Sequence, residues 1–322
     1  MKDKKIKLLE NKLNKQNNNF NIKLKEPIHI LNNHKDKVTC LSILKDGRLV
    51  SGSNDKSIII YNKITYQPDL IIKEHNDDIN YITTLSSGIL TSCSYDKIIK
   101  LFNIKENKYE ILQTLNYHTR SVNKIIELKN KSLVSCSDDN SIIFYNKDNN
   151  NNYIKDYNLN INVMCHSVIE TKDNEICYSQ YHYPNHTIYF YDLLHKKTIS
   201  KLNNINANSY INKGFIMISK ELLLIPGINK ISIININEYE LIRIIDVLNS
   251  SKIIGVCMLN ENILFTGDIN GIIREWKIEG NNLSLISIKE NAHNGPVWSL
   301  IKLGDGHIAS GSFDKSIKIW QK

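Results

Sequence analysis

Residues 307–320, near the end of the chain, read HIASGSFDKSIKIW. An apolar run opens this stretch, a polar turn sequence around Asp314 follows, and a second apolar run ends on Trp320. Two short apolar runs joined by a tight polar turn predict a β-hairpin. The stretch therefore indicates two antiparallel strands with an aromatic residue at the end of the second.

The same pattern occurs three more times, ending on Tyr61, Phe102 and Tyr145. Residues 48–61 read RLVSGSNDKSIIIY, residues 89–102 read ILTSCSYDKIIKLF, and residues 132–145 read SLVSCSDDNSIIFY. Weaker copies end at Tyr191, Ile234 and Trp276. The seven end positions are 61, 102, 145, 191, 234, 276 and 320. So constant a step is typical of four-stranded propeller blades and is not demanded by a β-sandwich.

The repeated residues resemble those of the WD-repeat family. In that family a blade carries a His before its first strand, a Ser or Thr in the second, an Asp in the next turn and a Trp in the third. The matching residues are His34, Ser51, Asp55 and Tyr61; His75, Ser92, Asp96 and Phe102; His118, Ser135, Asp139 and Tyr145; and His293, Ser310, Asp314 and Trp320. The resemblance covers residues 26–322 and implies an all-β, seven-bladed β-propeller of four-stranded antiparallel blades.

Blades 4 to 6 depart from the family pattern. Blade 6 keeps Thr266, Asn270 and Trp276 but lacks the His, and blades 4 and 5 have neither a clear His nor a turn Asp. The Asp of the Trp-Asp pair survives only as Asp192. Blade 4 is expected to have a longer turn through residues 181–185. These blades are therefore predicted mainly from the period.

The recurring Ser, His and Asp could be mistaken for a hydrolytic triad. A triad occurs once in a site, whereas this trio recurs in four blades beside an aromatic residue. We therefore predict a structural hydrogen-bond network in which the turn Asp accepts from His, and His links to the strand Ser and the aromatic residue. Tyr in place of Trp is expected to weaken the last link, and Phe102 to lose it because Phe has no donor.

The chain ends two residues after Trp320, so blade 7 has only three strands of its own. An unpaired edge there would expose a row of N–H and C=O groups. Residues 27–31 align with the expected fourth strand of blade 1, near residues 69–73. We predict that residues 27–31 form the outer strand of blade 7 and close the ring.

The formal net charge of +8 is concentrated at the N-terminus. Residues 1–25 hold eight lysines and two acids, which leaves about +2 for the remaining chain. A propeller body this close to neutral is not expected to bind nucleic acid. The arm itself is predicted to be either a poorly ordered segment or a short amphipathic helix with Ile6, Leu9 and Leu13 on one face, suited to an acidic partner or an anionic membrane surface.

Other chemistry-bearing patterns are missing from the sequence. The six cysteines form no CxxC pair and do not combine with histidines at the spacing of a metal site. The glycines form no phosphate-binding loop, and no apolar run is long enough to span a bilayer. We expect no cofactor, no metal, no catalytic residue and no membrane span, and a cytoplasmic or nuclear location in a reducing compartment.

The resemblance also implies a partner-binding face, formed by the loops before the first strands and between the second and third strands. Two positions in each strong blade are expected to project there, one just before the turn Asp and one at the start of the first strand. These residues are Asn54, Tyr95, Asp138, Phe313, Thr39, Asn80, Asn123 and Trp298. Trp298, Phe313 and Tyr95 are the expected interface anchors, with packing of Trp298 against a neighbouring blade as the alternative.

The predicted function is a non-enzymatic scaffold or adaptor that binds peptides or proteins, as a monomeric domain within a larger complex. Two alternatives are a substrate receptor of a ubiquitin ligase and an RNA-associated assembly factor that uses the basic arm. An enzyme would need an unrepeated nucleophile–base set, which the sequence does not contain. The identity of the partner is not encoded in the fold pattern.

Overall fold

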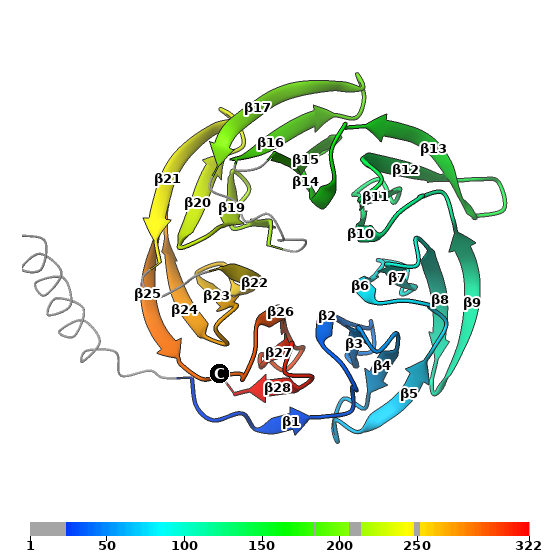
Figure 1. The fold of residues 1–322 in the computed structure, drawn as a ribbon, viewed down its shortest axis with the longest axis vertical. Coiled ribbons are helices and arrows are strands. Elements are labelled where there is room, and N and C mark those ends of the chain that lie inside the picture. The colour runs from blue at the N-terminus through cyan, green and yellow to red at the C-terminus, as the bar shows by residue number, and fades with distance from the viewer. Residues whose placement is uncertain (1–23, 183–184, 206–213, 248–251, 322) are drawn as a thin grey trace, which may run out of the picture.

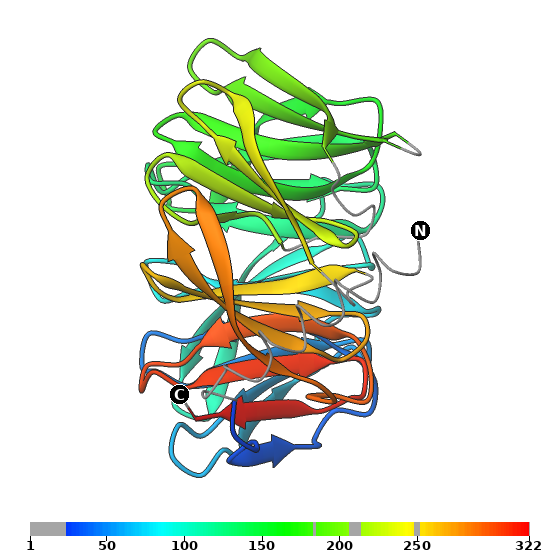
Figure 2. The ribbon, with the colours of Figure 1, turned by 90° about the vertical axis from the view of Figure 1, so that its left-hand side faces the viewer.

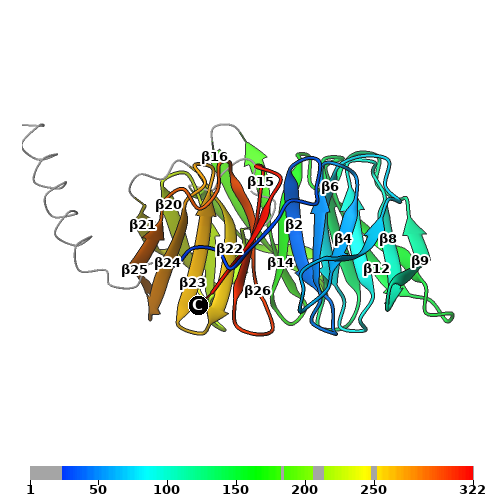
Figure 3. The ribbon, with the colours of Figure 1, turned by 90° about the horizontal axis from the view of Figure 1, so that it is seen from below.

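A computed structural model of the chain describes residues 24–182, 185–205, 214–247 and 252–321. These residues form seven four-stranded antiparallel sheets arranged as blades around a central axis (Figure 1). Seen from the side, the ring is a flat disc (Figure 3). The described segments contain no helix. The predicted seven-bladed β-propeller is confirmed.

Each blade runs from an inner strand beside the axis to an outer strand at the rim (Figure 1). Blades 1 to 3 comprise β2 (Val38–Ile43), β3 (Leu49–Ser53), β4 (Ile58–Tyr61) and β5 (Pro68–Ile72); β6 (Ile79–Thr84), β7 (Leu90–Ser94), β8 (Ile99–Lys105) and β9 (Lys108–Leu115); and β10 (Val122–Glu127), β11 (Leu133–Ser137), β12 (Ser141–Lys147) and β13 (Tyr153–Asn160). Blades 4 and 5 comprise β14 (Cys165–Lys172), β15 (Glu175–His182), β16 (Asn185–Asp192) and β17 (Lys197–Ile205); and β18 (Ile216–Met217), β19 (Leu222–Pro226), β20 (Lys230–Asn235) and β21 (Glu240–Asp246). Blades 6 and 7 comprise β22 (Ile253–Asn260), β23 (Ile263–Asp268), β24 (Ile273–Glu279) and β25 (Asn282–Lys289); and β26 (Val297–Lys302), β27 (Ile308–Ser312), β28 (Ile317–Trp320) and β1 (His29–Leu31).

All seven repeat positions fall on the third strand of a blade, including the weak copies Tyr191, Ile234 and Trp276. All seven side chains are buried. In blades 1 to 6 the pairing of the third with the fourth strand shifts register at this residue, as between Ile60 and Tyr61. A β-bulge bends the strand that carries the extra residue. The backbone therefore repeats the same irregularity at the positions that the sequence period identifies.

The ring closes between its first and last strands. β1 pairs antiparallel with β28, with His29 opposite Ile319 and Leu31 opposite Ile317. The Ile28 N–H also donates to the Ile319 carbonyl at 2.8 Å. Figure 2 shows β1 beside the last strand at one end of the disc. Closure by the N-terminal strand agrees with the prediction from residues 27–31, and the regular strand occupies the last three of them.

The N-terminal part of the chain that packs on the propeller begins at residue 24, before the end of the arm expected at residue 25. Leu24 is buried in a cluster with Phe265 and Trp320 of blades 6 and 7. Glu26 forms an ion pair with Lys289 of β25, at 2.6 Å. Residues 24 and 25, assigned to the arm from the sequence, thus lie at the propeller wall. The predictions for residues 1–23 concern a segment outside the described residues.

The hydrophobic core consists of seven clusters, one between each pair of neighbouring blades. The blades approach most closely where the second strand carries a small residue. A Cβ on Gly311 would lie 2.8 Å from Val38 Cγ1 of blade 1. Cys93 and Cys136 occupy the equivalent position in blades 2 and 3 and are fully buried. Each blade therefore depends on its neighbours to bury its faces.

The prediction of a longer turn in blade 4 was wrong in its detail. The extra residues extend the hairpin, because β15 and β16 have eight residues each and pair as far as His182 with Asn185. Residues 183 and 184, which join these strands, lie outside the described residues. Backbone pairing satisfies the N–H and C=O groups of the longer segment, which an extended loop would leave to solvent.

Candidate binding site on the propeller face

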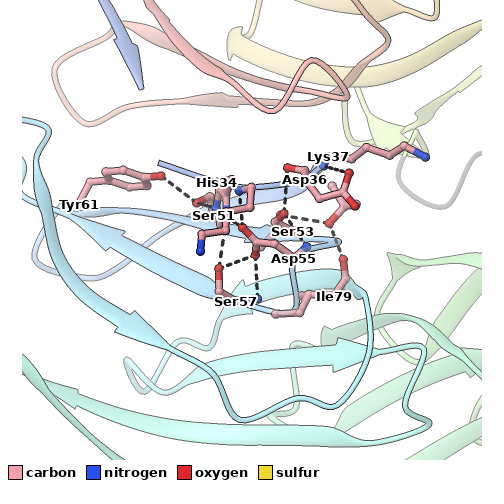
Figure 4. A network of polar contacts seen from close by, with 12 residues as sticks. His34, Asp36, Lys37, Ser51, Ser53, Asp55, Ser57, Tyr61 and Ile79 are labelled. Carbon is pink, nitrogen blue, oxygen red and sulfur yellow. Dashed lines mark hydrogen bonds and ion pairs between the residues drawn. The ribbon is translucent and has the colours of Figure 1, made fainter. Parts of the chain in front are cut away.

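The recurring polar residues form a hydrogen-bond network inside each strong blade. In blade 1 His34 Nδ1 lies 2.9 Å from Asp55 Oδ2, and His34 Nε2 lies 2.6 Å from Ser51 Oγ (Figure 4). The Lys35 N–H also donates to Asp55 Oδ2 at 2.8 Å. Three segments distant in sequence are thereby tied together: the loop before β2, the strand β3 and the turn after it.

Blades 2, 3 and 7 contain the same network. The His–Asp distances are 2.7, 2.8 and 2.8 Å, and the His–Ser distances are 2.6, 2.6 and 2.7 Å, for the sets His75, Asp96 and Ser92; His118, Asp139 and Ser135; and His293, Asp314 and Ser310. The same three residue types are therefore joined by hydrogen bonds in all four of these blades.

The aromatic link depends on the residue at the end of the third strand. Trp320 Nε1 donates to Ser310 Oγ at 2.7 Å, and the Tyr145 hydroxyl lies 2.9 Å from Ser135 Oγ. At Tyr61 the corresponding distance is 3.4 Å. The expected weakening therefore applies to Tyr61, whereas Tyr145 keeps a full hydrogen bond because its hydroxyl reaches the serine. Phe102 has no polar atom to make this contact.

A second serine joins the network in three blades and was missed by the sequence prediction. Ser57, Ser141 and Ser316 donate to Asp Oδ1 at 2.5, 2.5 and 2.6 Å. Each follows the turn Asp by two residues, so the Asp-x-Ser spacing was the available signal. Blade 2 has Ile98 at this position.

The network is buried and polarised. Burial opposes ionisation of Asp55, Asp139 and Asp314, but the hydrogen bonds from His and Ser outweigh it and hold the pKa of each carboxyl well below its usual range. Burial lowers the pKa of the His293 imidazole. The linked serines, such as Ser51 and Ser310, are 0% exposed. These serine hydroxyls are therefore shielded from solvent and engaged within the network.

Blade 6 replaces the histidine network with another buried contact. Asp268 and Arg274 form an ion pair at 2.6 Å, and both side chains are buried. Trp276 Nε1 donates to Thr266 Oγ1 at 2.9 Å, as Trp320 does to Ser310. Thr266 and Trp276, identified from the sequence, therefore keep the aromatic link although the His is absent.

A cavity of about 310 Å³ opens on the face formed by the loops before the first strands and between the second and third strands. All eight residues expected on this face line it. They are Asn54, Tyr95, Asp138, Phe313, Thr39, Asn80, Asn123 and Trp298. We call this space the face cavity. Its walls come from blades 7, 1, 2, 3 and 4, which follow one another around the ring.

A β-bulge positions four of these side chains. In blades 1, 2, 3 and 7 the pairing of the first with the second strand skips one residue, which is Thr39, Asn80, Asn123 or Trp298. A bulged residue is left out of the ladder and its side chain is re-aimed. This irregularity explains why the start of each inner strand contributes a side chain to the face cavity.

Three of the bulged residues also connect neighbouring blades. Thr39 Oγ1 donates to the Ile79 carbonyl of blade 2, and Asn80 Nδ2 donates to the Val122 carbonyl of blade 3 at 2.8 Å. Asn123 Nδ2 donates at 2.9 Å to the carbonyl of Cys165 in blade 4. Their side chains are buried, so these donors are already used within the ring.

Blade 7 differs from these three blades because its bulged residue is Trp298. Its indole stacks on Phe313 of the same blade, with ring centroids 4.3 Å apart and an angle of 17° between the planes. The Lys37 ammonium lies 4.8 Å from the centroid of the Phe313 ring. Trp298 and Phe313 are half-buried, and Tyr95 across the cavity is 49% exposed. These three aromatic residues offer apolar surface to a ligand.

Four further residues line the cavity that were not predicted from the sequence, and most of them are charged or titratable. Lys37, Asp78, Met164 and His166 line it in addition to the predicted residues. Asp138 accepts from Asn123 Nδ2 at 2.6 Å and lies 3.3 Å from His166 Nε2. Lys37 and Asp78 each precede a bulged residue by two positions, so the repeat alignment carried the signal for them.

Comparison with known families finds three matches to the family described as WD domain, G-beta repeat. They cover residues 25–62, 109–146 and 285–321. Each matched segment includes all or part of the outer strand of one blade and the first three strands of the next. The chain contains three WD repeats. No match was found among curated proteins.

The WD-repeat model recognises segments ending in blades 1, 3 and 7, while the structure supplies the four remaining blades. Propellers of this family generally serve as protein-interaction scaffolds. Within the described residues, no cluster of three His, Cys, Asp or Glu side chains is arranged to hold a metal ion. The same part of the chain contains no helix of the length and hydropathy needed to cross a membrane.

Proposed function

We propose that this protein is a non-enzymatic scaffold that binds a segment of a partner protein at the face cavity. The observation that carries the proposal is the stacked pair Trp298 and Phe313, which stands half-exposed beside a cavity of about 310 Å³ with Tyr95 across it. Aromatic side chains that remain accessible at a concave surface are typical anchors of interfaces.

The bulged positions support this assignment by contrast. In blades 1, 2 and 3 the bulged residue donates a hydrogen bond to the neighbouring blade, from Thr39, Asn80 or Asn123. In blade 7 the same position is occupied by Trp298. An aromatic residue there exposes apolar surface to water, a cost that a bound partner removes. The binding energy is therefore expected to concentrate on blade 7 and on Tyr95.

The cavity composition disfavours the RNA-associated alternative. Asp78 and Asp138 line the same space, and their negative charge repels phosphate groups. A basic arm remains available to such a function outside the propeller. The substrate-receptor alternative is a special case of the scaffold and would use the same cavity.

The test compares affinity purifications from lysate with wild type, Trp298→Ala, Phe313→Ala and Tyr95→Ala. Ile64→Ala is the matched control, since Ile64 is 77% exposed in the connection between β4 and β5 and does not line the cavity. We expect a common set of partners to be lost from the three cavity variants and kept by the control. Equal recovery by all variants, with each folded by circular dichroism, would refute the proposed binding site.

The location in a reducing compartment also remains a proposal. All six cysteines lie in the described residues, are buried and form no disulfide there, as in proteins that do not rely on disulfides. A fluorescent fusion with the full chain would test the proposed cytoplasmic or nuclear location.

A further inference from the structure

One side of the face cavity is acidic. Asp78 and Asp138 line it, and Asp77 adjoins Asp78; we call these three residues the acidic wall. Tyr95 lies beside this wall. Burial raises the pKa of the Tyr95 phenol, and the charges of the three carboxylates raise it further. The aromatic ring and the negative charges therefore share one part of the cavity.

The acidic wall has few cations of its own. Among the described residues, neither Asp77 nor Asp78 has an ion-pair partner, and Asp138 pairs only with His166 at 3.3 Å. Burial raises the pKa of Asp78, and the charges of Asp77 and Asp36 raise it further, whereas the charges of Lys56 and Lys37 lower it by less. The negative charges of the acidic wall therefore repel one another. A cation placed beside them would reduce this repulsion.

The cavity already holds one ammonium group at an aromatic ring. Lys37 Nζ lies 4.8 Å from the centroid of Phe313. Figure 4 shows the Lys37 side chain pointing away from His34 and Asp55. Lys37 lines the cavity together with Asp78 and Asp138, so two carboxylates there face one lysine ammonium group.

We propose that the partner segment inserts a lysine or arginine side chain into the face cavity, with its cation between the Tyr95 ring and the acidic wall. This inference rests on the proposed function and names the chemistry of the ligand. The carboxylates attract the positive charge, and the ring face adds a cation–π contact. A neighbouring apolar side chain of the same segment packs against Trp298.

Two other occupants are distinguishable. An acidic or phosphorylated segment would have to place its charge near the acidic wall, with Lys37 as its nearest cation. The second is the chain's own lysine-rich segment, residues 1–23, which has the right charge for the wall. The charge of the cavity favours a basic side chain over an anion, and the experiment separates a partner's segment from this one.

The experiment is selection from a phage-displayed library of random twelve-residue peptides on four full-length proteins and one control variant. They are wild type, Trp298→Ala, the double variant Asp78→Asn with Asp138→Asn, and a variant with the seven lysines of residues 1–23 changed to Gln. Asp305→Asn is the matched control, because Asp305 is an exposed carboxylate in the turn between β26 and β27 and does not line the face cavity. Circular dichroism establishes that each protein is folded.

The selected peptides decide between the outcomes. We expect wild type and Asp305→Asn to select peptides that share one lysine or arginine position, and the double variant not to select them. Peptides that depend on Trp298 but share no basic residue would overturn this inference and leave the proposed function in place. Selection of no Trp298-dependent peptide would overturn both. If only the lysine-to-glutamine variant selects peptides, residues 1–23 are the occupant of the cavity. That result would overturn the proposal that a partner's side chain binds there.

A binding measurement then tests the contact itself. In fluorescence anisotropy, changing the shared basic residue of a selected peptide to Gln should weaken its binding to wild type about tenfold, as expected for loss of a charge-assisted hydrogen bond. The same change should have little effect on binding to the double variant. An equal loss with both proteins would place the basic residue elsewhere and overturn the proposal. Since Asp138 also accepts from Asn123, Asp77→Asn with Asp78→Asn provides a second variant that leaves this bond intact.

Discussion

The hydroxyl of Tyr145 lies 2.9 Å from the hydroxyl of Ser135, deep inside blade 3. A tyrosine thus completes in this blade the polar chain that Trp320 completes in blade 7. We expect Tyr145→Phe to lower the free energy of unfolding by about 0.5–1.5 kcal/mol, because one buried hydrogen bond is lost while Ser135 keeps its contact to His118. Urea denaturation followed by tryptophan fluorescence measures the change.

Blade 2 provides the reciprocal test of that bond. Phe102 occupies the position of Tyr145 and is buried. Phe102→Tyr should recover a similar amount of stability if the new hydroxyl reaches Ser92. A loss of more than about 1 kcal/mol would mean that overpacking outweighs the bond and that blade 2 is shaped for a phenyl ring.

Removal of one turn carboxylate should be more costly than removal of the aromatic link. Asp314 contacts the side chains of His293 and Ser316 and the Asn294 N–H. Asp314→Asn removes a charged acceptor from this buried network, and we expect a loss of about 1–3 kcal/mol in urea denaturation. Asp173→Asn is the control, since Asp173 is exposed and its ion pair with Lys129 is a surface contact. Equal effects of the two changes would contradict a structural role for the network.

The pH dependence of stability follows from the same groups. The pKa values of Asp55, Asp96, Asp139 and Asp314 are lowered in the fold, so their contribution is present above the unfolded value near 4 and is lost as pH falls below it. The pKa of His293 is also lowered, by burial, so its neutral form favours the fold above about pH 6.5 and protonation of the unfolded chain weakens it below. The urea midpoint should therefore fall from pH 7 to pH 5 and more steeply below pH 4. A midpoint that rises on acidification would contradict this sign.

Ring closure predicts a difference between two truncations. Deletion of residues 1–31 removes β1 and the buried Leu24, leaving the edge of β28 unpaired, and should lower the melting temperature of the whole propeller. Deletion of residues 1–20 keeps both and should be tolerated. Differential scanning calorimetry distinguishes the two outcomes, and equal melting temperatures for both truncations and the full chain would refute closure by β1.

The close approach of blades 7 and 1 gives a last prediction. Gly311→Ala places a Cβ 2.8 Å from Val38 Cγ1 and should cost about 1–3 kcal/mol by overpacking. Val38→Ala in the same chain removes that methyl group, so the double variant should lose less than the sum of the two single variants. Gly304→Ala is the control, since nothing lies within 4 Å of its Cβ position. Additive losses would show that the two positions do not meet.

The polar networks of this molecule were predictable because the residues that form each of them lie within one repeat. His34, Ser51 and Asp55 recur at the same spacing in four blades, and the same geometry recurs with them. Blades 4 and 5 lack these residues and were predicted only from the period. The eight face residues were predictable as neighbours for the same reason, since each blade presents the same two positions to one face.

The sequence by itself determined the number of blades, the internal network and the residues that face the cavity, because each depends on short-range spacing inside a repeat. Only the tertiary structure decided which of these side chains remain available. Thr39, Asn80 and Asn123 are bonded to the next blade, whereas Trp298 stacks on Phe313. The tertiary structure also places Lys37, Asp78 and His166 in the same cavity. These relationships depend on the twist of each sheet and the distance between neighbouring blades, and a repeat read in isolation contains neither.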